Sequence, residues 1–427
     1  MNVKMLSSPR HCVSLLLAVF VSGCYGYSIR YDGYKVLRVD ASNERHLRLM
    51  NQLQHDRELD FWKFPKDVMV PPEKLAGVVE RLDSNGVAYD VMIADVQKLI
   101  DSQETQYIEG RHNLDLAGYD FTRYYNLSEI AQWVKDIAAT YPSLATEVQV
   151  GLSYEGRELR ALKVGSEQSE SKEAIWFHGT LHSREWISPA TVMFMTNQLL
   201  VDYSHDPDVQ KYLDTYDFYI LPVMNPDGYE YTWTDNRLWR KTRSPNEGSP
   251  CYGTDGNRNF EFMWGEPGAS DDPCDNNYRG PFAHSEIEVK SVTDFILDTS
   301  EKQTFSLFID FHCYGQMWIT PWAYSIEEPL HYSEQHTCAG RAASAIESVH
   351  GTPYIYGNII SNADPASGLT LDWGYGTANI KHSYLVELRD RGEYGFLLPE
   401  DQIIPSGEET YAGLKAMLDC ILEGQVV

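Results

Sequence analysis

The expected fold follows from one stretch of the chain, residues 174–190, which reads Ala-Ile-Trp-Phe-His-Gly-Thr-Leu-His-Ser-Arg-Glu-Trp-Ile-Ser-Pro-Ala. Its short apolar beginning, Ala174–His178, predicts a buried strand. The pair Ser188-Pro189 predicts the start of a helix, with serine as the N-cap and proline at the first helical position. We therefore expect His182 and Glu185 to lie at a turn between a strand and a helix.

This turn is a candidate metal site. A histidine and a carboxylate three residues apart can bind one ion, and zinc accepts both as ligands. The pattern His-x-x-Glu is also common by chance, so a surface histidine beside a solvated glutamate is the alternative for His182 and Glu185. A third ligand could come from His312, which ends the apolar run Phe305–Phe311. Taken alone, His312 would be interpreted as a hydrogen-bonded core histidine.

Other apolar runs predict the rest of a sheet. Phe218–Val223, Phe305–His312 and Ser383–Leu388 resemble Ala174–His178 and are separated by helical patterns. Near-continuous apolar strands alternating with helices are typical of a parallel or mixed sheet covered on both faces. We therefore predict an α/β fold with a mixed central sheet, and ligands beyond the carboxyl ends of its strands.

The segment before this domain has a different sequence pattern. Between Tyr34 and Gln106, short strand patterns alternate with helical patterns at Asn43–Leu53 and Pro72–Asn85. They predict a small antiparallel α+β sandwich. The polar segment that follows contains Gly110 and Arg111, and it is either a linker cut by a trypsin-like protease or an ordinary interdomain loop.

The first residues predict secretion. Lys4 and Arg10 precede an apolar run, Val13–Val21, which is followed by small and polar residues up to Gly26. This order is typical of a signal peptide, and the run is too short to span a bilayer. No later stretch resembles a transmembrane helix, so we expect a soluble, exported protein.

Composition argues against some partners. The 427 residues carry a formal charge of −27 and a sequence pI of about 4.8. Phosphate backbones and anionic membrane surfaces would be repelled by most of such a surface. Nucleic acids and membranes are therefore not expected as partners.

The chain has seven cysteines, of which Cys12 and Cys24 would leave with the signal peptide. Cys251 and Cys274 flank a segment rich in Gly, Asn, Asp and Pro, which makes them candidates for a disulfide in an oxidising compartment. Three other cysteines remain, Cys313, Cys338 and Cys420, and at least one of them must be unpaired. A bridge between Cys338 and Cys420 is one option.

Further charged residues stand out against their surroundings. Glu387 lies inside the strand-like run Ser383–Leu388, where an unpaired carboxylate is costly to bury. Either it pairs with Arg389 or Arg391, or it faces a metal ion as a functional group. Basic clusters at 236–243 and 255–259 suggest a bound anion. A solvated surface stripe is the alternative, and we favour it for Lys241 and Arg243 but less for Arg240 and Arg258.

Five motifs along the chain together resemble the digestive metallocarboxypeptidases of the carboxypeptidase A/B family and their propeptides. They occur in family order: His182-Ser183-Arg184-Glu185-Trp186-Ile187, Asn225-Pro226-Asp227-Gly228, Arg237-Leu238-Trp239-Arg240-Lys241-Thr242-Arg243, Asp255-Gly256-Asn257-Arg258-Asn259 and Glu387-Leu388-Arg389-Asp390. The resemblance implies a secreted zymogen that removes the C-terminal residue of peptides and proteins. It implies a signal peptide (1–26), an activation propeptide (27–111) cut near Arg111, and a catalytic domain (112–427).

The resemblance also implies roles for single residues. One zinc ion would be bound by His182, Glu185 and His312. Glu387 would take a proton from the attacking water and pass it to the leaving amine, and Arg240 would stabilise the oxyanion. The implied substrate-binding residues are Asn257 and Arg258 for the free carboxylate, and Arg184 and Tyr314 at subsidiary subsites. The resemblance implies a disulfide between Cys251 and Cys274, and we expect a monomer.

One position departs from the family pattern. Asp364 stands where the family has a mobile tyrosine, two residues before Ala366-Ser367-Gly368. The resemblance implies that Leu371 forms the floor of the specificity pocket. Further apolar residues would line it, namely Ile359, Ala363, Leu369 and Leu385. Such a pocket favours substrates with an apolar C-terminal residue. The alternatives are a preference for Lys or Arg through Asp364, and a zinc-bearing protein that binds C-termini without cutting them.

Overall fold

The computed structural model describes residues 29–56, 59–110, 119–167, 172–358 and 365–425. Several predictions concern residues outside these ranges. These are the signal peptide, the cleavage near Arg111, and three residues expected near the specificity pocket, Ile359, Ala363 and Asp364.

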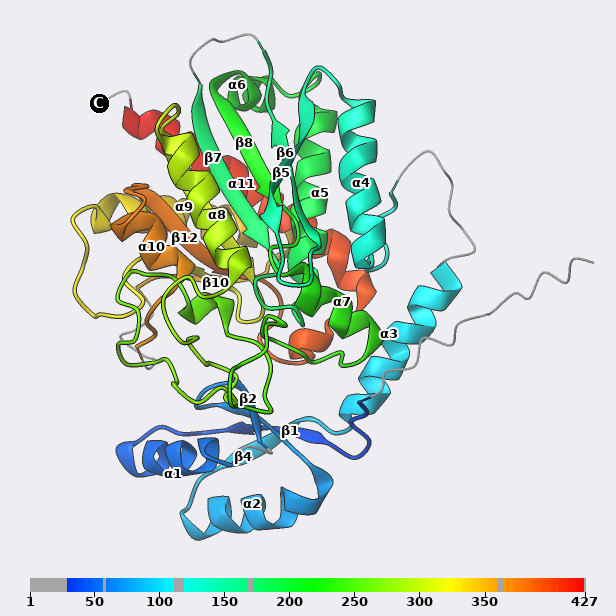
Figure 1. The fold of residues 1–427 in the computed structure, drawn as a ribbon, viewed down its shortest axis with the longest axis vertical. Coiled ribbons are helices and arrows are strands. Elements are labelled where there is room, and N and C mark those ends of the chain that lie inside the picture. Colours follow the sequence, from blue (N-terminus) through cyan, green and yellow to red (C-terminus); the bar gives the residue numbers. More distant parts are fainter. Residues whose placement is uncertain (1–28, 57–58, 111–118, 168–171, 359–364, 426–427) are drawn as a thin grey trace, which may run out of the picture.

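The N-terminal part of the described chain forms a small antiparallel sheet (Figure 1). Its strand order is β2-β3-β1-β4 and all its pairs are antiparallel, with β1 at Lys35–Val39, β2 at Asp60–Lys63, β3 at Asp67–Val70 and β4 at Tyr89–Ile93. Two helices share a core with one face of this sheet, α1 (Glu44–Gln54) and α2 (Pro72–Ser84). The predicted α+β sandwich is confirmed.

The small sheet is joined to the large domain. Helix α3 (Val96–Gly110) leads away from the sheet and runs beside the large domain in Figure 1. The other face of the sheet, including Val36, Met69 and Ile93, belongs to the same apolar cluster as the core of the large domain. The two parts are therefore packed together through buried apolar side chains.

The large domain contains an eight-stranded mixed sheet, as predicted. Its order is β11-β10-β12-β9-β7-β8-β6-β5, and the neighbouring strands from β12 to β8 are all parallel. The bounds are β5 Ala145–Leu152, β6 Glu158–Val164, β7 Glu173–Gly179, β8 Tyr216–Leu221, β9 Phe305–His312, β10 Met317–Ile319, β11 Ile355–Gly357 and β12 His382–Glu387. The predicted run Phe305–His312 coincides with β9.

Helices cover both faces of the large sheet. One face shares an apolar cluster with α4 (Leu127–Thr140), α5 (Ile187–Asp202), α6 (Pro207–Thr215), α7 (Pro226–Thr234), α9 (Tyr332–His350) and α11 (Ile403–Gln425). The other face packs against α8 (Ile287–Ser300) and α10 (Thr370–Gly376). Side chains alternate between these faces from Leu307 to Phe311 of β9, so Leu307, Ile309 and Phe311 lie in the first cluster and Phe308 in the second.

The start of α5 differs from the prediction. The helix begins at Ile187, so Ser188 and Pro189 lie in its first turn and Ser188 is not the N-cap. The Ser188 hydroxyl instead donates to the carbonyl of Phe311 at 2.6 Å and accepts from the backbone N–H of Thr180 at 3.0 Å. The Ser188 hydroxyl thus binds β9, and it does not cap the N-terminus of α5.

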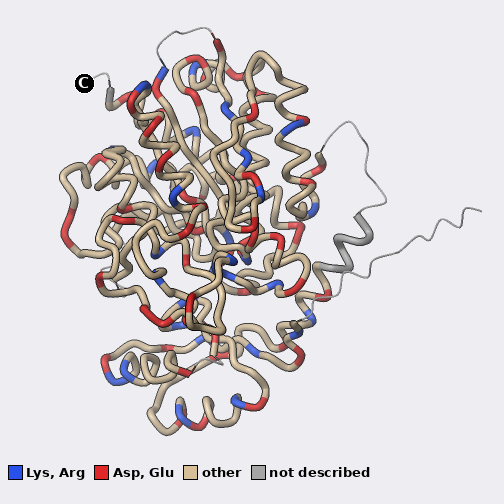
Figure 2. The backbone as a smooth tube through the Cα atoms, in the orientation of Figure 1, with Lys and Arg blue, Asp and Glu red and all other residues tan. Residues whose placement is uncertain are grey.

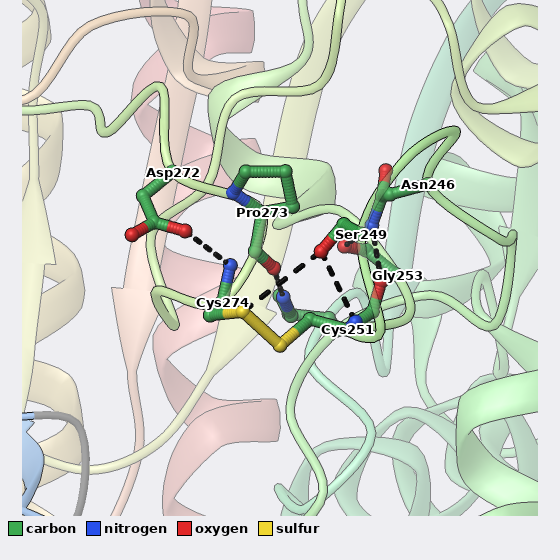
Figure 3. Close-up of a disulfide and its surroundings, with 8 residues drawn as sticks. Asn246, Ser249, Cys251, Gly253, Asp272, Pro273 and Cys274 are labelled. Carbon is green, nitrogen blue, oxygen red and sulfur yellow. Dashed lines mark hydrogen bonds between the residues drawn. A yellow bond between two sulfur atoms is a disulfide. The ribbon is translucent and has the colours of Figure 1, made fainter.

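Two disulfides are present among the described residues. Cys251–Cys274 joins two loops (Figure 3), where the backbone N–H of Cys274 donates to Asp272. Cys338–Cys420 links α9 to α11, and Cys313 is a buried free thiol. The first pair was predicted, and the second was one of the options that the sequence left open.

The Cys338–Cys420 bridge is expected to stabilise the protein, because it closes a separation of 82 residues. Cross-linking such a distant pair restricts the unfolded chain, so the double variant Cys338→Ala/Cys420→Ala should lose about 2–4 kcal/mol in its free energy of unfolding. Urea unfolding followed by tryptophan fluorescence measures this. Cys251→Ala/Cys274→Ala, with a separation of 23 residues, should lose less. An unchanged midpoint in the first variant would contradict the expectation.

Charged residues are distributed over the whole described chain. Asp and Glu residues occur in the N-terminal part with the small sheet and in the large domain alike (Figure 2). In the part of the chain that the structure describes, no helix is both long and apolar enough to cross a membrane.

Candidate active site

Three side chains converge at the carboxyl ends of the central strands. His182 and Glu185 lie in the turn between β7 and α5, and His312 is the last residue of β9. Glu185 Oε1 is 2.8 Å from His182 Nδ1, and its Oε2 is 2.9 Å from His312 Nδ1. The three side chains are buried, and one ligand atom of each lies within 4.8 Å of the others. Among the described residues, they are a group that could hold a metal ion.

The donor set fits zinc. Two imidazole nitrogens and a carboxylate oxygen are ligands that zinc prefers, and three protein ligands are typical of a catalytic zinc. Behind the rings lie two carboxylates. His182 Nε2 is 2.9 Å from Asp255 Oδ1, and His312 Nε2 is 2.7 Å from Asp310 Oδ2. A carboxylate in this place orients a ligating imidazole with its other nitrogen toward the metal.

Glu387 ends β12, beside His312 in the parallel register of β12 and β9. Its Oε2 is buried and has no hydrogen-bond partner among the described residues. Burial raises the pKa of Glu387 to about 7, even though the charge of His312 favours the ionised form. The ion pair with Arg389 that the sequence left open is absent, because Arg389 binds Glu409 at 2.7 and 2.5 Å.

Asp255 organises the basic groups of the site. Its Oδ2 accepts a hydrogen bond from Arg240 Nη2 at 2.8 Å and lies 3.9 Å from Arg258 Nη1. Burial alone would raise the pKa of Asp255, but Arg240 and His182 hold it well below the usual range. Asn257 follows, and its side-chain oxygen accepts from the backbone N–H of Thr370 at 2.9 Å.

The neighbouring Lys241 corrects one prediction. We favoured a place for it on a solvated stripe, but it is buried, and its ammonium group donates to the carbonyl of Pro273 at 2.6 Å. Arg243 stacks over the ring of Tyr231, with 3.7 Å from its guanidinium carbon to the ring centre.

The candidate metal ligands and several of the neighbouring charged groups line one cavity of about 270 Å³. The cavity is bordered by the three candidate metal ligands, by Glu387, and by Arg240, Asn257 and Arg258. Its remaining wall is largely apolar and has Leu371 among its buried residues, together with Met317, Ile319, Ala323, Leu369 and Leu385. The cavity thus brings an anion-binding side and an apolar side close to one possible metal centre.

The small sheet closes this cavity. Trp62 and Lys63 of β2, with Phe64, contribute to its lining, and the Trp62 ring lies 5.0 Å from the ring of Phe396. Asp60 Oδ2 accepts a 2.7 Å hydrogen bond from Arg184. Tyr314 donates to Asp67 at 2.7 Å. Arg184 and Tyr314, which we predicted as subsite residues, are therefore engaged by the small sheet.

The described residues that we predicted for the site come together around this cavity. Arg184 is next to it, held against the small sheet, and Asp364 lies outside the described residues. We assigned no role to two residues that hold the histidine rings, Asp255 and Asp310. A signal for Asp310 was available, since residues two apart in a strand share a face and Asp310 precedes His312 in β9 by two.

Comparison with known proteins agrees with this arrangement. The sequence profile of zinc carboxypeptidases matches residues 130–413, and that of the carboxypeptidase activation peptide matches residues 37–103. Carboxypeptidase A2 of Mus musculus is 39% identical over 95% of this chain and 97% of its own. Carboxypeptidase B of Bos taurus is 36% identical over 96% of this chain and 98% of its own.

Solved structures show the same fold. The crystal structure of carboxypeptidase A from Helicoverpa armigera has a TM-score of 0.85 and 27% identity, and covers 93% of this chain and 99% of that one. The structure of thrombin activatable fibrinolysis inhibitor has a TM-score of 0.83 and 31% identity, and covers 91% and 98%. The chain belongs to the zinc carboxypeptidase family, and it is a zinc-dependent hydrolase with an activation peptide.

Proposed function

We propose that the protein is a secreted digestive zymogen whose mature form removes an apolar residue from the C-terminus of peptides and proteins. The observation that carries this proposal is the single cavity that joins the His182–Glu185–His312 cluster, Glu387, two guanidinium groups and an apolar wall. Each of these parts matches one requirement of exopeptidase chemistry.

His182, Glu185 and His312 would hold one zinc ion. Zinc bound there would supply Lewis-acid chemistry, polarising a carbonyl oxygen and making water easier to deprotonate. Glu387 would act as the general base, accepting a proton from the attacking water at its unpaired Oε2. The same carboxyl group would then deliver that proton to the leaving amine nitrogen.

The guanidinium groups supply positive charge where the substrate is negative. Arg240, held by Asp255, would stabilise the oxyanion that develops on the former carbonyl oxygen. Arg258 and Asn257 would bind the free carboxylate of the terminal residue. Because that carboxylate exists only at the chain end, this contact restricts cleavage to the last peptide bond.

The side chain of the terminal residue would enter the apolar wall around Leu371. The described residues that line this wall are Met317, Ile319, Ala323, Ala366, Leu369, Leu371 and Leu385. None of them carries a carboxylate. An ammonium or guanidinium group buried there would lose its hydration without gaining a partner. This supports a preference for apolar residues over Lys and Arg.

The small sheet would keep the zymogen inactive. Strand β2 lies over the cavity, and Asp60 holds Arg184. We propose that residues 27–111 are the propeptide, that a trypsin-like protease releases it by cutting near Arg111, and that residues 112–427 then act as a monomer. The contacts of β2 support this order of events, because a substrate cannot share the cavity with Trp62.

The expected result is that trypsin-treated protein releases Phe or Leu from the end of a blocked peptide faster than Lys or Arg. The ratio of kcat/KM should be at least about tenfold, since an unpaired buried cation costs more than the ~1.4 kcal/mol that corresponds to tenfold. Chromatography of the released amino acid measures it, and untreated protein should be slower. Absence of release from every peptide would contradict the enzyme. A Lys or Arg preference that is lost in Asp364→Ala would contradict the proposed pocket.

A further inference from the structure

A strip of polar side chains runs along one face of the central sheet toward His312. In the parallel register of β7 and β9, His178 lies opposite Asp310. Residues two apart in a strand share a face, so Trp176 and His178 lie on the same face of β7, as do Asp310 and His312 on β9. These four side chains are 0–1% exposed. Such polar groups are rarely buried without a function or a full set of partners.

Asp310 is the centre of this strip. Its Oδ2 is 2.7 Å from His312 Nε2 and accepts a 2.6 Å hydrogen bond from the hydroxyl of Thr370, at the start of α10. A carboxylate can only accept at this oxygen, so the 2.7 Å contact with Asp310 places a ring proton on Nε2, and the amide nitrogen of Asn257, 3.2 Å from the same Nε2, is the more distant neighbour. That assignment leaves Nδ1, the nitrogen that faces Glu185, with its lone pair free to bind a metal.

His178 lies on the other side of Asp310. Its Nε2 is 3.1 Å from Asp310 Oδ1, although the two atoms are not aligned for a hydrogen bond. The indole N–H of Trp176 donates to His178 Nδ1 at 2.9 Å. Because an indole N–H can only donate, Nδ1 of His178 is the acceptor and Nε2 carries the proton that faces Asp310. Trp176 therefore fixes which nitrogen His178 presents to the carboxylate.

The two histidine ligands are thus supported in different ways. Behind His182, Asp255 is neutralised by Arg240. Behind His312, Asp310 is faced by His178 and Thr370 and is removed from solvent. A buried carboxylate without compensation would be unfavourable, and besides His312 the polar groups that face Asp310 are the Thr370 hydroxyl, which donates to it, and His178, 3.1 Å away.

We propose that Asp310 and His178 are positioning residues for the metal site, with Asp310 orienting His312 and His178 acting through Asp310. The inference rests on the proposed ligand set, to which neither residue belongs. Outer partners of this kind typically account for 10–100-fold in metal affinity, so Asp310→Asn should weaken zinc binding by about that factor. His178→Gln should weaken it less. In the Asp310→Asn background, His178→Gln should have no further effect.

The test uses the full chain, equilibrated in buffers of fixed free zinc set by a chelator, with bound zinc measured by atomic absorption. Cobalt-substituted protein adds a second readout, because its absorption bands shift when the bond between the His312 ring nitrogen and the metal ion changes. The matched control is Glu288→Gln, which also removes a buried carboxylate, from α8, and should bind zinc like the wild type. Thr370→Val, which removes only the hydroxyl that bonds Asp310, provides a milder change if Asp310→Asn does not fold.

Different results refute different claims. If the wild type does not retain zinc, the ligand set itself is wrong. If the wild type retains zinc and Asp310→Asn binds it as tightly as Glu288→Gln, the positioning role is wrong. Should Asp310→Asn not fold, equal zinc binding by His178→Gln, Thr370→Val and Glu288→Gln would refute it in the same way. Effects of His178→Gln and Asp310→Asn that multiply in the double variant would refute the claim that His178 acts through Asp310.

Discussion

Replacing Glu387 with glutamine is expected to lower kcat by about 10²–10⁴-fold, which is the usual contribution of a positioned general base. Glutamine has nearly the same shape, but its amide cannot accept the proton that a carboxylate takes from water. The loss should be large because Glu387 Oε2 has no protein partner among the described residues. Its proton-accepting capacity is therefore available to a substrate or to water.

The measurement is the kcat of the trypsin-treated variant on a peptide ending in Phe, with zinc content determined in parallel. Zinc should remain bound, because Glu387 is outside the proposed ligand set. Glu288→Gln is the matched control, since burial raises the pKa of Glu288 to about 7 as it does for Glu387, and Glu288 lies in α8 away from the cavity. A kcat for Glu387→Gln within a few-fold of the wild type would exclude the proposed base.

The sequence predicted the parts of the fold that depend on short-range patterns. Phe305–His312 coincides with β9 because an apolar run bounded by polar residues has few alternatives to a buried strand. The convergence of His182 and His312 was predictable for a related reason. Both follow or end parallel strands, and the carboxyl ends of such strands meet at one edge of a sheet.

The sequence could not predict contacts that depend on how distant surfaces pack. Ser188 was expected to cap α5 because local signals favour that role, but its hydroxyl is used by Phe311 of β9. The bond between Asp60 and Arg184 spans 124 positions and forms only because the small sheet lies on the cavity. No periodicity in the sequence encodes such a pairing.

Removal of one metal ligand is expected to have an effect at least as large as the loss of the base. His182→Ala should lower kcat/KM by at least about 10³-fold, since the Lewis acid contributes several kcal/mol and each 1.36 kcal/mol is a factor of ten. The substitution leaves two candidate ligands, Glu185 and His312, and it also removes the ring that binds Asp255 Oδ1. Because Asp255 also holds Arg240, this residue should become less ordered. Weaker zinc binding and a less ordered Arg240 should both lower kcat/KM.

Two comparisons separate these causes. Wild-type protein treated with a chelator should lose activity and recover it when zinc is added, whereas His182→Ala should stay inactive at the same zinc concentration. His205→Ala, which removes an exposed histidine beyond the end of α5, should keep both zinc and activity. If His182→Ala retained one zinc per chain and wild-type kcat/KM, the ion would have to be held by other residues. The roles proposed for Glu387 and Arg240 would then lose the metal centre around which they are arranged.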